Sequence, residues 1–302
     1  MGSSGKIDDL LRWAGDDDAQ EEYFALLSMH PRFVEAARAL SGNLLALAGS
    51  DPAFDGLHKD AGRFLTGCWA MSLHLSGGLT LPRLKEVCAK AGIMSPGRAR
   101  SLLQFLLFLH YVEALPAGER GAPIRYAPTQ AMLASWGAMV RAGLAAASIV
   151  EPAVSVVVAR LDEPDVLARF MAYLGSSFLP TVLGKPYRQF MDTFLEPHAG
   201  VQLIDLIVMT TKDGDVFPPS RPIPISINAT AQRLRVSRAH IRRILDRGQD
   251  EGLLTRRKDG TILLGEAMRS TVRYLLALRL YGFLVCAAKT HAAMQEPATL
   301  TP

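Results

Sequence analysis

Residues 238–249 show a helical pattern of apolar and polar positions. At 100° per residue, the apolar positions share one face: Ile241, Ile244, Leu245 and Gly248. The opposite face and its flanks are polar or small: Ala239, Arg242, Arg243 and Asp246, flanked by Arg238, His240 and Arg247. The pattern therefore predicts an amphipathic helix with a packed back and an arginine-rich front.

The residues before this helix predict a second, shorter helix and a turn. The run 226–234 opens with residues of the capping type and then reads as a helix. Arg235-Val236 makes the turn between the two helices. Ser237 is a good N-cap for the second helix, because its hydroxyl can accept a hydrogen bond from an early backbone N–H.

The residues after the helix predict a β-hairpin. Glu251-Gly252 ends the helix, and residues 253–255 begin a strand. The basic run 256–258 leads to Asp259-Gly260, a strong hairpin-turn signal, and 261–264 is the return strand. Two helices followed by a hairpin with a basic tip give the order of a winged helix-turn-helix.

The charge of the chain is unevenly distributed. Ten residues between Arg221 and Lys258 are basic: Arg221, Arg233, Arg235, Arg238, Arg242, Arg243, Arg247, Arg256, Arg257 and Lys258. Three acidic residues oppose them, so this stretch carries +7, and the rest of a chain of net charge +4 carries −3. A basic island on a mildly acidic body is typical of proteins that bind polyanions.

The run 236–260 resembles the DNA-binding core of bacterial winged-helix regulators of the GntR and MarR kind. The likeness covers about 40 residues, 226–264, of the 302. Those families read DNA with the second helix and touch the backbone or the minor groove with the wing. Together with the helix pattern, this gives the expected DNA contacts: Ser237, Arg238, Ala239, His240, Arg242, Arg243 and Arg247 in the helix, and Arg256, Arg257 and Lys258 in the wing.

A diverged second copy of the pattern lies upstream. A shift of 142 residues places Ser95 on Ser237, Arg100 on Arg242, Leu102 on Ile244, Leu103 on Leu245, and Tyr111-Val112 on Leu253-Leu254. Thr80 can cap a preceding helix, Ser95-Pro96 is a clear helix start, and 116–126 reads as a looser wing. We interpret 79–126 as a first winged helix.

Two uses of this first copy remain open. Its outward positions Gly97, Arg100, Ser101 and Gln104, with Arg98 beside them, can still meet DNA, so Arg98 and Arg100 are further candidate contacts. The run 105–109, however, is apolar all round, which is typical of a helix enclosed by protein. This enclosure favours a homodimer in which only the second copies touch DNA.

The remaining sequence is sparse in chemical motifs. Cys68, Cys88 and Cys286 are far apart, and we find no metal-ligand spacing and no nucleophile–base pairing, so neither an enzyme nor a cofactor is expected. The N-terminus does not resemble a signal peptide, and charged or proline residues interrupt the apolar stretches, so no membrane span is expected. Aromatic and methionine residues at 170–194 are an ordinary core or, alternatively, a pocket for a small-molecule effector.

The sequence thus predicts a mainly α protein with two winged helix-turn-helix modules that have small β-hairpin wings. The expected regions are an N-terminal helical region 1–75, the first winged helix 76–138, a central helical region with a Pro-rich connector 139–220, the second winged helix 221–270, and a C-terminal helix and tail 271–302. The expected function is sequence-specific binding of double-stranded DNA by a cytoplasmic, nucleoid-associated transcriptional regulator. The alternative is a winged-helix scaffold that docks on the transcription machinery without a DNA site of its own.

Overall fold

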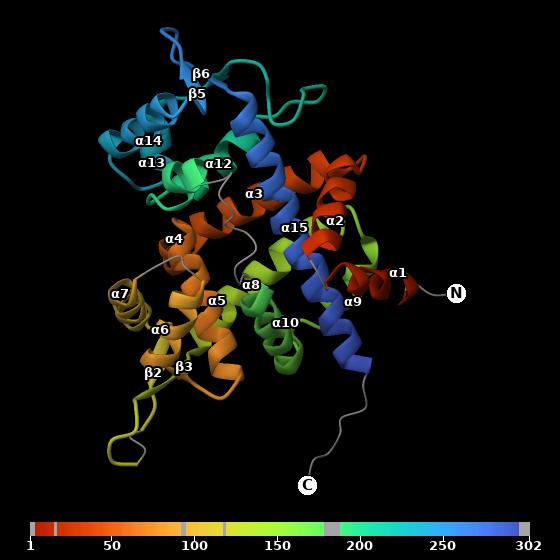
Figure 1. Ribbon diagram of the computed structural model, residues 1–302, viewed down its shortest axis with the longest axis vertical. Coiled ribbons are helices and arrows are strands. Elements are labelled where there is room, and N and C mark those ends of the chain that lie inside the picture. The colour runs from red at the N-terminus through yellow and green to blue at the C-terminus, as the bar shows by residue number, and fades with distance from the viewer. Residues whose placement is uncertain (1–3, 15–16, 92–94, 117–118, 178–187, 296–302) are drawn as a thin grey trace.

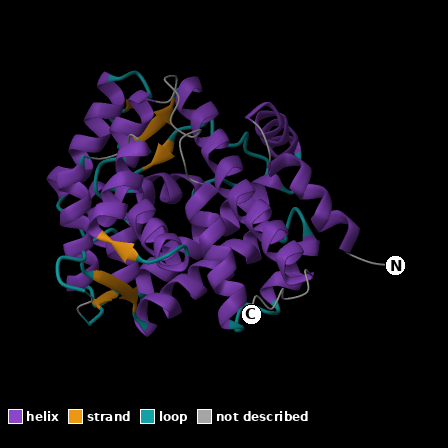
Figure 2. Cartoon of the chain, turned by 60° about the horizontal axis from the view of Figure 1, so that its bottom comes forward, coloured by secondary structure: helices purple, strands orange, loops and turns teal. Residues whose placement is uncertain are grey.

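The computed structural model of the chain describes residues 4–14, 17–91, 95–116, 119–177 and 188–295. About 70% of the chain is helical and 7% is in strands, so the expectation of a mainly α protein with small antiparallel sheets is confirmed. The helices fill most of the molecule, and the strands form two small, separate sheets (Figure 2).

The elements follow one another along the chain as shown in Figure 1. The first half contains α1 (Ser4–Asp9), η1 (Leu10–Ala14), α2 (Asp17–Met29), α3 (Phe33–Ser50), α4 (Pro52–His58), α5 (Ala61–Leu75), β1 (Leu79–Thr80), α6 (Leu81–Lys90), α7 (Pro96–Phe108), β2 (Val112–Ala114), β3 (Arg125–Pro128) and α8 (Gln130–Ala147). The second half contains η2 (Pro152–Val154), α9 (Ser155–Val158), α10 (Pro164–Ser177), α11 (Arg188–Phe190), the π-helical turn η5 (Met191–Leu195), α12 (Gly200–Met209), β4 (Ile223–Pro224), α13 (Ile227–Arg233), α14 (Arg238–Asp250), β5 (Leu254–Arg256), β6 (Thr261–Leu264) and α15 (Glu266–Gln295).

A central helical body separates the two sheets. The C-terminal helix α15 runs through this body and packs on α2, α3, α8 and α10 (Figure 1). By length and composition, α15 is the one helix among the described residues that could cross a membrane, and 72% of its most apolar window is buried inside the protein. The C-terminal helix that the sequence predicts is therefore present, and it packs mainly on the helices of the central body.

Asp205 on α12 joins four helices at the centre of this body. Its fully buried carboxylate accepts hydrogen bonds from Ser41 Oγ at 2.8 Å and from Arg279 Nη1 at 2.7 Å, and it lies 3.2 Å from His58 Nε2. Burial alone would raise the pKa of Asp205, but the nearby Arg279 and His58 outweigh burial and lower it to about 2. This cluster ties α3, α4, α12 and α15 together.

The two sheets have the same topology. The first has the strand order β1-β3-β2 and the second has β4-β6-β5, and all pairs are antiparallel. Each sheet follows a strand–helix–helix–strand–strand order in the chain, with α6 and α7 in the first unit and α13 and α14 in the second. We refer to residues 79–128 as the first module and to residues 223–264 as the second module.

The 142-residue shift also matches the local backbone of the two modules. It superimposes the bounds of α7 on those of α14 and the bounds of β2 on those of β5. The shift aligns His110, with φ of 53°, with Gly252, with φ of 69°. Both helices are therefore followed by a residue in the left-handed backbone conformation. The N–H of Tyr111 donates to the carbonyl of Leu106 at 2.9 Å, and the N–H of Leu253 donates to that of Gly248 at 2.8 Å.

The sequence missed the first strand of each sheet. β1 and β4 have only two residues each, too few to show the alternation of buried and exposed positions that marks a strand. They form because Leu79 pairs with Tyr126 and Ile223 pairs with Ile262. The later elements of the second module were predicted closely: the structure has α13, α14 and the return strand β6 where the pattern places them.

Candidate nucleic-acid interface

Helix α14 is seated on the body by its apolar back. Ile241, Ile244, Leu245 and Gly248 are its buried residues, as the helical pattern predicts. Gly248 allows the helix to approach closely, because a Cβ at this position would lie 3.1 Å from Phe194 Cζ and 3.1 Å from Leu254 Cδ2. The opposite face is thereby fixed toward solvent.

The N-terminus of α14 is capped as predicted. Ser237 Oγ accepts a hydrogen bond from the backbone N–H of His240 at 3.1 Å. The cap leaves Ala239, a small residue, exposed in the first turn. A capped helix start with a small side chain permits close approach of a ligand to the positive end of the helix dipole.

The front of α14 carries exposed guanidinium groups that no acid neutralises. Arg238, Arg242, Arg243 and Arg247 are all exposed, and within the described part of the chain none of them forms an ion pair. Other arginines of the chain have acidic partners, as the exposed Arg160 has in Glu163 and the half-buried Arg279 in Asp205. The exposed front of α14 is therefore a concentrated positive surface.

The hairpin β5–β6, which the sequence predicts as a wing, adds a smaller positive surface. Arg256 is half-buried and is held in an ion pair with Asp246 of α14, and its N–H donates to Gln249 Oε1 at 2.9 Å. Arg257 is exposed and lies 3.8 Å from Asp259, whereas Lys258 is exposed at the tip. Of the three wing residues, Arg256 thus holds the hairpin onto the helix, and Arg257 and Lys258 face solvent.

Asp259 shapes the turn of the wing. The hydroxyl of Thr261 donates to its carboxylate at 2.6 Å and the N–H of Thr261 donates at 3.0 Å, and these hydrogen bonds lower the pKa of Asp259. Gly260 follows with φ of 82°, a left-handed conformation that glycine adopts without strain. The Asp-Gly pair thus makes the turn that the sequence predicts.

Helix α7 presents a less basic version of the same surface. Ser95 Oγ accepts a hydrogen bond from the N–H of Arg98 at 3.3 Å, the same cap as in α14. Arg100, Ser101 and Gln104 are exposed on its front. Arg98 is instead half-buried, and its Nη2 lies 3.4 Å from Asp60 Oδ1.

Within a single chain, the expected enclosure of α7 along residues 105–109 does not extend to Phe108. Its side chain is 77% exposed, while Leu106 is buried and Phe105 packs under the guanidinium of Arg63, 4.5 Å from the ring centroid. The reason is that α7 rests on α5 and α6 by one face only. Apolar residues all round a helix do not by themselves show that every face is covered.

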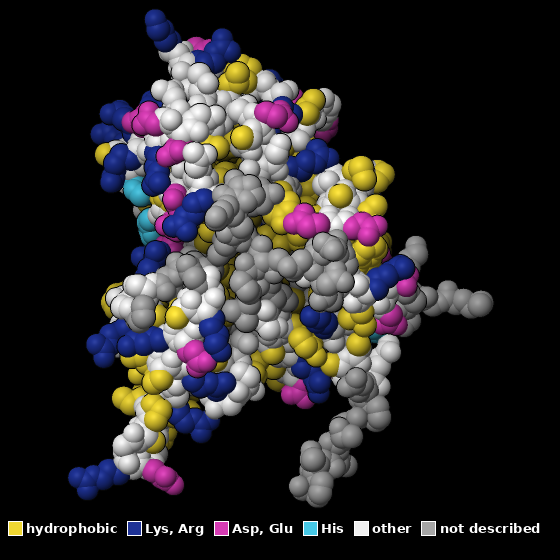
Figure 3. All heavy atoms as spheres, in the orientation of Figure 1, with side chains coloured by type: hydrophobic (Ala, Val, Ile, Leu, Met, Phe, Trp, Pro, Cys, Tyr) yellow, Lys and Arg dark blue, Asp and Glu magenta, His cyan; other side chains and the backbone are white. Residues whose placement is uncertain are grey.

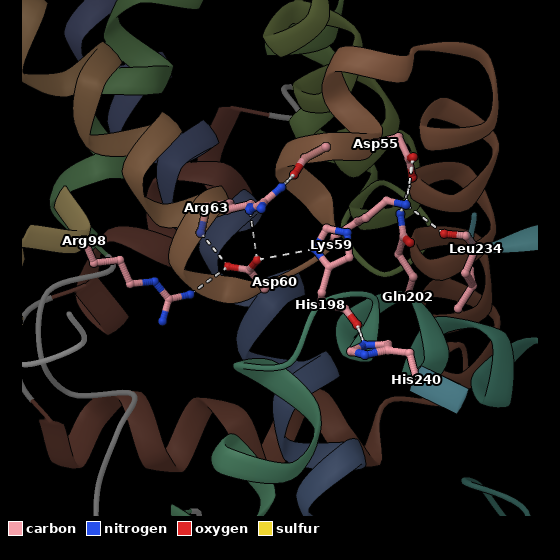
Figure 4. A network of polar contacts seen from close by, with 10 residues as sticks. Asp55, Lys59, Asp60, Arg63, Arg98, His198, Gln202, Leu234 and His240 are labelled. Carbon is pink, nitrogen blue, oxygen red and sulfur yellow. Dashed lines mark hydrogen bonds and ion pairs between the residues drawn. The ribbon is translucent and has the colours of Figure 1, made fainter. Parts of the chain in front are cut away.

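A chain of polar contacts joins the starts of α7 and α14 (Figure 4). Arg98 on α7 pairs with Asp60, whose other carboxylate oxygen lies 3.9 Å from His198 Nδ1. The carbonyl oxygen of His198 lies 2.5 Å from Nε2 of His240 on α14. Arg98 and His240 occupy equivalent positions in the 142-residue repeat, so each module contributes the same helix position to this bridge.

Two further contacts lie beside this bridge of Arg98, Asp60, His198 and His240. Lys59 Nζ donates to the carbonyl of Leu234 at 2.7 Å, and Arg235 lies 3.6 Å from Asp55. These contacts connect α4 and its C-terminal end with the turn before α14. Sequence reasoning missed Asp60 and His198: Asp60 reads as a helix cap, which it is, but nothing in the sequence indicates its distant partners.

The two helices lie on one edge of the molecule. Figure 1 shows α14 at the upper left and α7 at the lower left, and Figure 3 shows lysine and arginine side chains along the same edge with histidines between them. The residues expected to bind DNA thus fall into two groups. Arg98, His240 and Arg256 are engaged within the protein, and the exposed ones are Ser237, Arg238, Ala239, Arg242, Arg243, Arg247, Arg257, Lys258 and Arg100.

Among the residues that the structure describes, no three histidine, cysteine or acidic side chains are grouped to hold a metal ion. Comparison of the chain with protein-family models, with curated proteins and with solved structures found no match.

Proposed function

We propose that the chain is a sequence-specific regulator that binds double-stranded DNA and reads its major groove with α14. In this proposal both modules are winged helices, with the hairpin β5–β6 as the wing of the second. The repeated strand–helix–helix–strand–strand order and the shared sheet topology support the assignment. A protein with this function would act in the cytoplasm, at the nucleoid.

The observation that carries the proposal is the unpaired arginine front of α14. A helix of this width fits the major groove of B-form DNA, where an arginine fork donates two hydrogen bonds to guanine O6 and N7. Arg242 and Arg243 lie in the middle of that front, between exposed Arg238 and Arg247. A surface built for protein docking would carry more apolar side chains at these positions.

The wing and the helix ends fit contacts with the DNA backbone. Exposed Arg257 and Lys258 project from a hairpin that Arg256 fastens to α14, so they can reach a phosphate or the minor groove beside the helix. The positive end of the α14 dipole at Ser237 favours a phosphate as well. Arg256 itself then orients the wing rather than touching DNA.

The exposure of Phe108 changes how the two modules would be used. The sequence-based expectation is a homodimer in which a second subunit covers the 105–109 face of α7, and an exposed Phe108 is compatible with it. However, α7 also exposes Arg100, Ser101 and Gln104 on the same edge as α14. We therefore favour one chain whose two modules both face the duplex and read an asymmetric site. A homodimer in which only α14 reads DNA remains the competing arrangement.

A second function has a specific observation in its favour. Phe108 is 77% exposed and Ile124, before the return strand of the first module, is 60% exposed. Exposed apolar side chains of this kind are typical of protein-docking surfaces. In this alternative, the first module docks on the transcription machinery and no specific DNA sequence is read.

A gel-shift titration with mixed genomic duplexes tests the proposal. Each neutralised phosphate releases counterions, so affinity should fall by about 100-fold between 50 and 200 mM salt when roughly four phosphates are contacted. The absence of binding at about 50 mM salt, or binding insensitive to salt, contradicts the proposal and leaves the docking alternative.

A further inference from the structure

A cavity of about 120 Å³ lies in the central body, between the two modules. Helices α5, α8, α10, α12 and α15 and the turn η5 contribute to its wall. Most of the wall is aliphatic, methionine or aromatic, including Leu65, Met139, Leu174, Leu195, Leu278 and Phe283. Protein interiors rarely keep voids larger than a water molecule, so a cavity of this size needs an explanation.

The size and chemistry of the cavity define what fits. An apolar cavity of about 150 Å³ stays dry and takes up benzene, so this cavity matches a molecule of about one six-membered ring. Among the described wall residues, the charged or chargeable groups have partners already: Arg279 and His58 pair with Asp205 at 2.7 and 3.2 Å, and Asp60 pairs with Arg63 at 3.2 Å and with Arg98 at 3.4 Å. A charged ligand would lose its hydration without gaining a free counter-charge, which is costly.

The cavity touches the bridge between the two DNA-facing helices. Asp60 is part of its wall and is also the acid that holds Arg98 of α7 and lies beside His198. Ala61 of α5 and Val201 of α12, the helices that precede β1 and β4 in the chain, line the cavity as well. An occupant would therefore contact the helices that lead into both modules, beside the bridge that joins α7 and α14.

We propose that this cavity binds a neutral, apolar small molecule of about benzene size, and that its occupancy changes the relative placement of α7 and α14. The binding step stands on the cavity alone. The consequence for DNA affinity rests on the proposed function, because it requires that these two helices face DNA.

Melting of the full-length protein with toluene tests the binding step. Toluene should raise the melting temperature by about 2 °C in a saturable manner, whereas benzoate, with the same ring and a negative charge, should not. Ala61→Leu fills the cavity from α5 and Val201→Phe fills it from α12, and each should abolish the toluene shift. Ala25→Leu, at an exposed position of α2, is the matched control and should keep it.

The outcomes separate the two parts of the inference. No toluene shift, a shift with benzoate of equal size, or a toluene shift that survives in both filled variants overturns the site. If toluene binds, a gel shift with and without toluene tests the coupling: at least a threefold change in DNA affinity supports it, and an unchanged affinity overturns it. A protein that binds toluene but no DNA contradicts the proposed function and leaves the site standing.

Discussion

At the scale of single residues, the structure divides the basic side chains by what already holds them. Arg242 and Arg243 are exposed without an acidic partner among the described residues, whereas Arg98 and Arg256 are paired with Asp60 and Asp246. A free guanidinium can bind a base edge without first breaking an ion pair. Arg242 and Arg243 should therefore contribute more to recognition of the DNA sequence than Arg98 and Arg256 do.

Substitutions on the front of α14 and in the wing should have different effects. Arg242→Ala or Arg243→Ala should cost about 1–3 kcal/mol on the preferred duplex and relax its sequence preference. Arg257→Ala or Lys258→Ala should weaken all sequences about equally, because phosphates carry no sequence information. Equilibrium gel shifts on preferred and scrambled duplexes measure both effects.

Two further variants complete this comparison. Arg160→Ala removes an exposed arginine of the central body that pairs with Glu163, and it should change neither affinity nor preference. Arg100→Ala should lose as much affinity as Arg242→Ala if both modules read DNA. Identical behaviour of the helix and wing variants would refute the assigned roles.

At the level of helices and strands, short-range sequence patterns predict the elements of the second module but not the contacts between the two modules. The Ser237 cap, the apolar back of α14 and the Asp259-Gly260 turn depend on neighbours within a few residues, and the sequence predicts each of them. The strands β1 and β4 and the exposure of Phe108 depend on partners far along the chain. The bridge through Asp60 and His198 depends on tertiary packing in the same way, so no short-range pattern reveals it.

The packing of α8 on α15 gives a prediction at this scale. A Cβ at Gly143 of α8 would lie 2.1 Å from the ring of Phe283 on α15, so Gly143→Ala should force the two helices apart. Overpacking of this kind destabilises by about 1–3 kcal/mol. Chemical denaturation measures the free energy of unfolding of the variant against the wild type.

Gly49→Ala is the matched control for this substitution. Gly49 lies in α3, and a Cβ there would meet no atom within 4 Å. Because alanine favours a helix more than glycine does, this variant should be stabilised by about 0.5–1 kcal/mol. Equal destabilisation of both variants would show that helix α8 does not pack against Phe283 as described.

At the scale of the whole molecule, the central body connects the two modules through charge as well as through apolar packing. Asp205 is fully buried and joins four helices, with Arg279 and His58 as its charged or chargeable partners. Removing one member of a buried ion pair leaves the other uncompensated. The stability of the body should therefore depend on the ionised form of this one carboxylate.

Acid titration of stability tests the role of Asp205. Its pKa in the folded protein is about 2, lower than in the unfolded chain, so its contribution is present above about pH 4 and is lost as pH falls toward 2. Asp205→Asn should cost about 3 kcal/mol at pH 7, and the gap to the wild type should narrow below about pH 4. A gap that is constant from pH 7 to pH 3, or one that widens in acid, would contradict this account of the carboxylate.

Selection from a random pool of duplexes shows whether α14 reads the sequence of duplex DNA, as we propose. The wild-type chain should enrich one motif that contains guanines, because arginine pairs with guanine in the major groove. The double variant Arg242→Ala with Arg243→Ala should lose this enrichment while the melting temperature stays within about 2 °C of the wild type, since both side chains are exposed. A wild-type pool without any enriched motif, or the same motif enriched by the double variant, would contradict the claim.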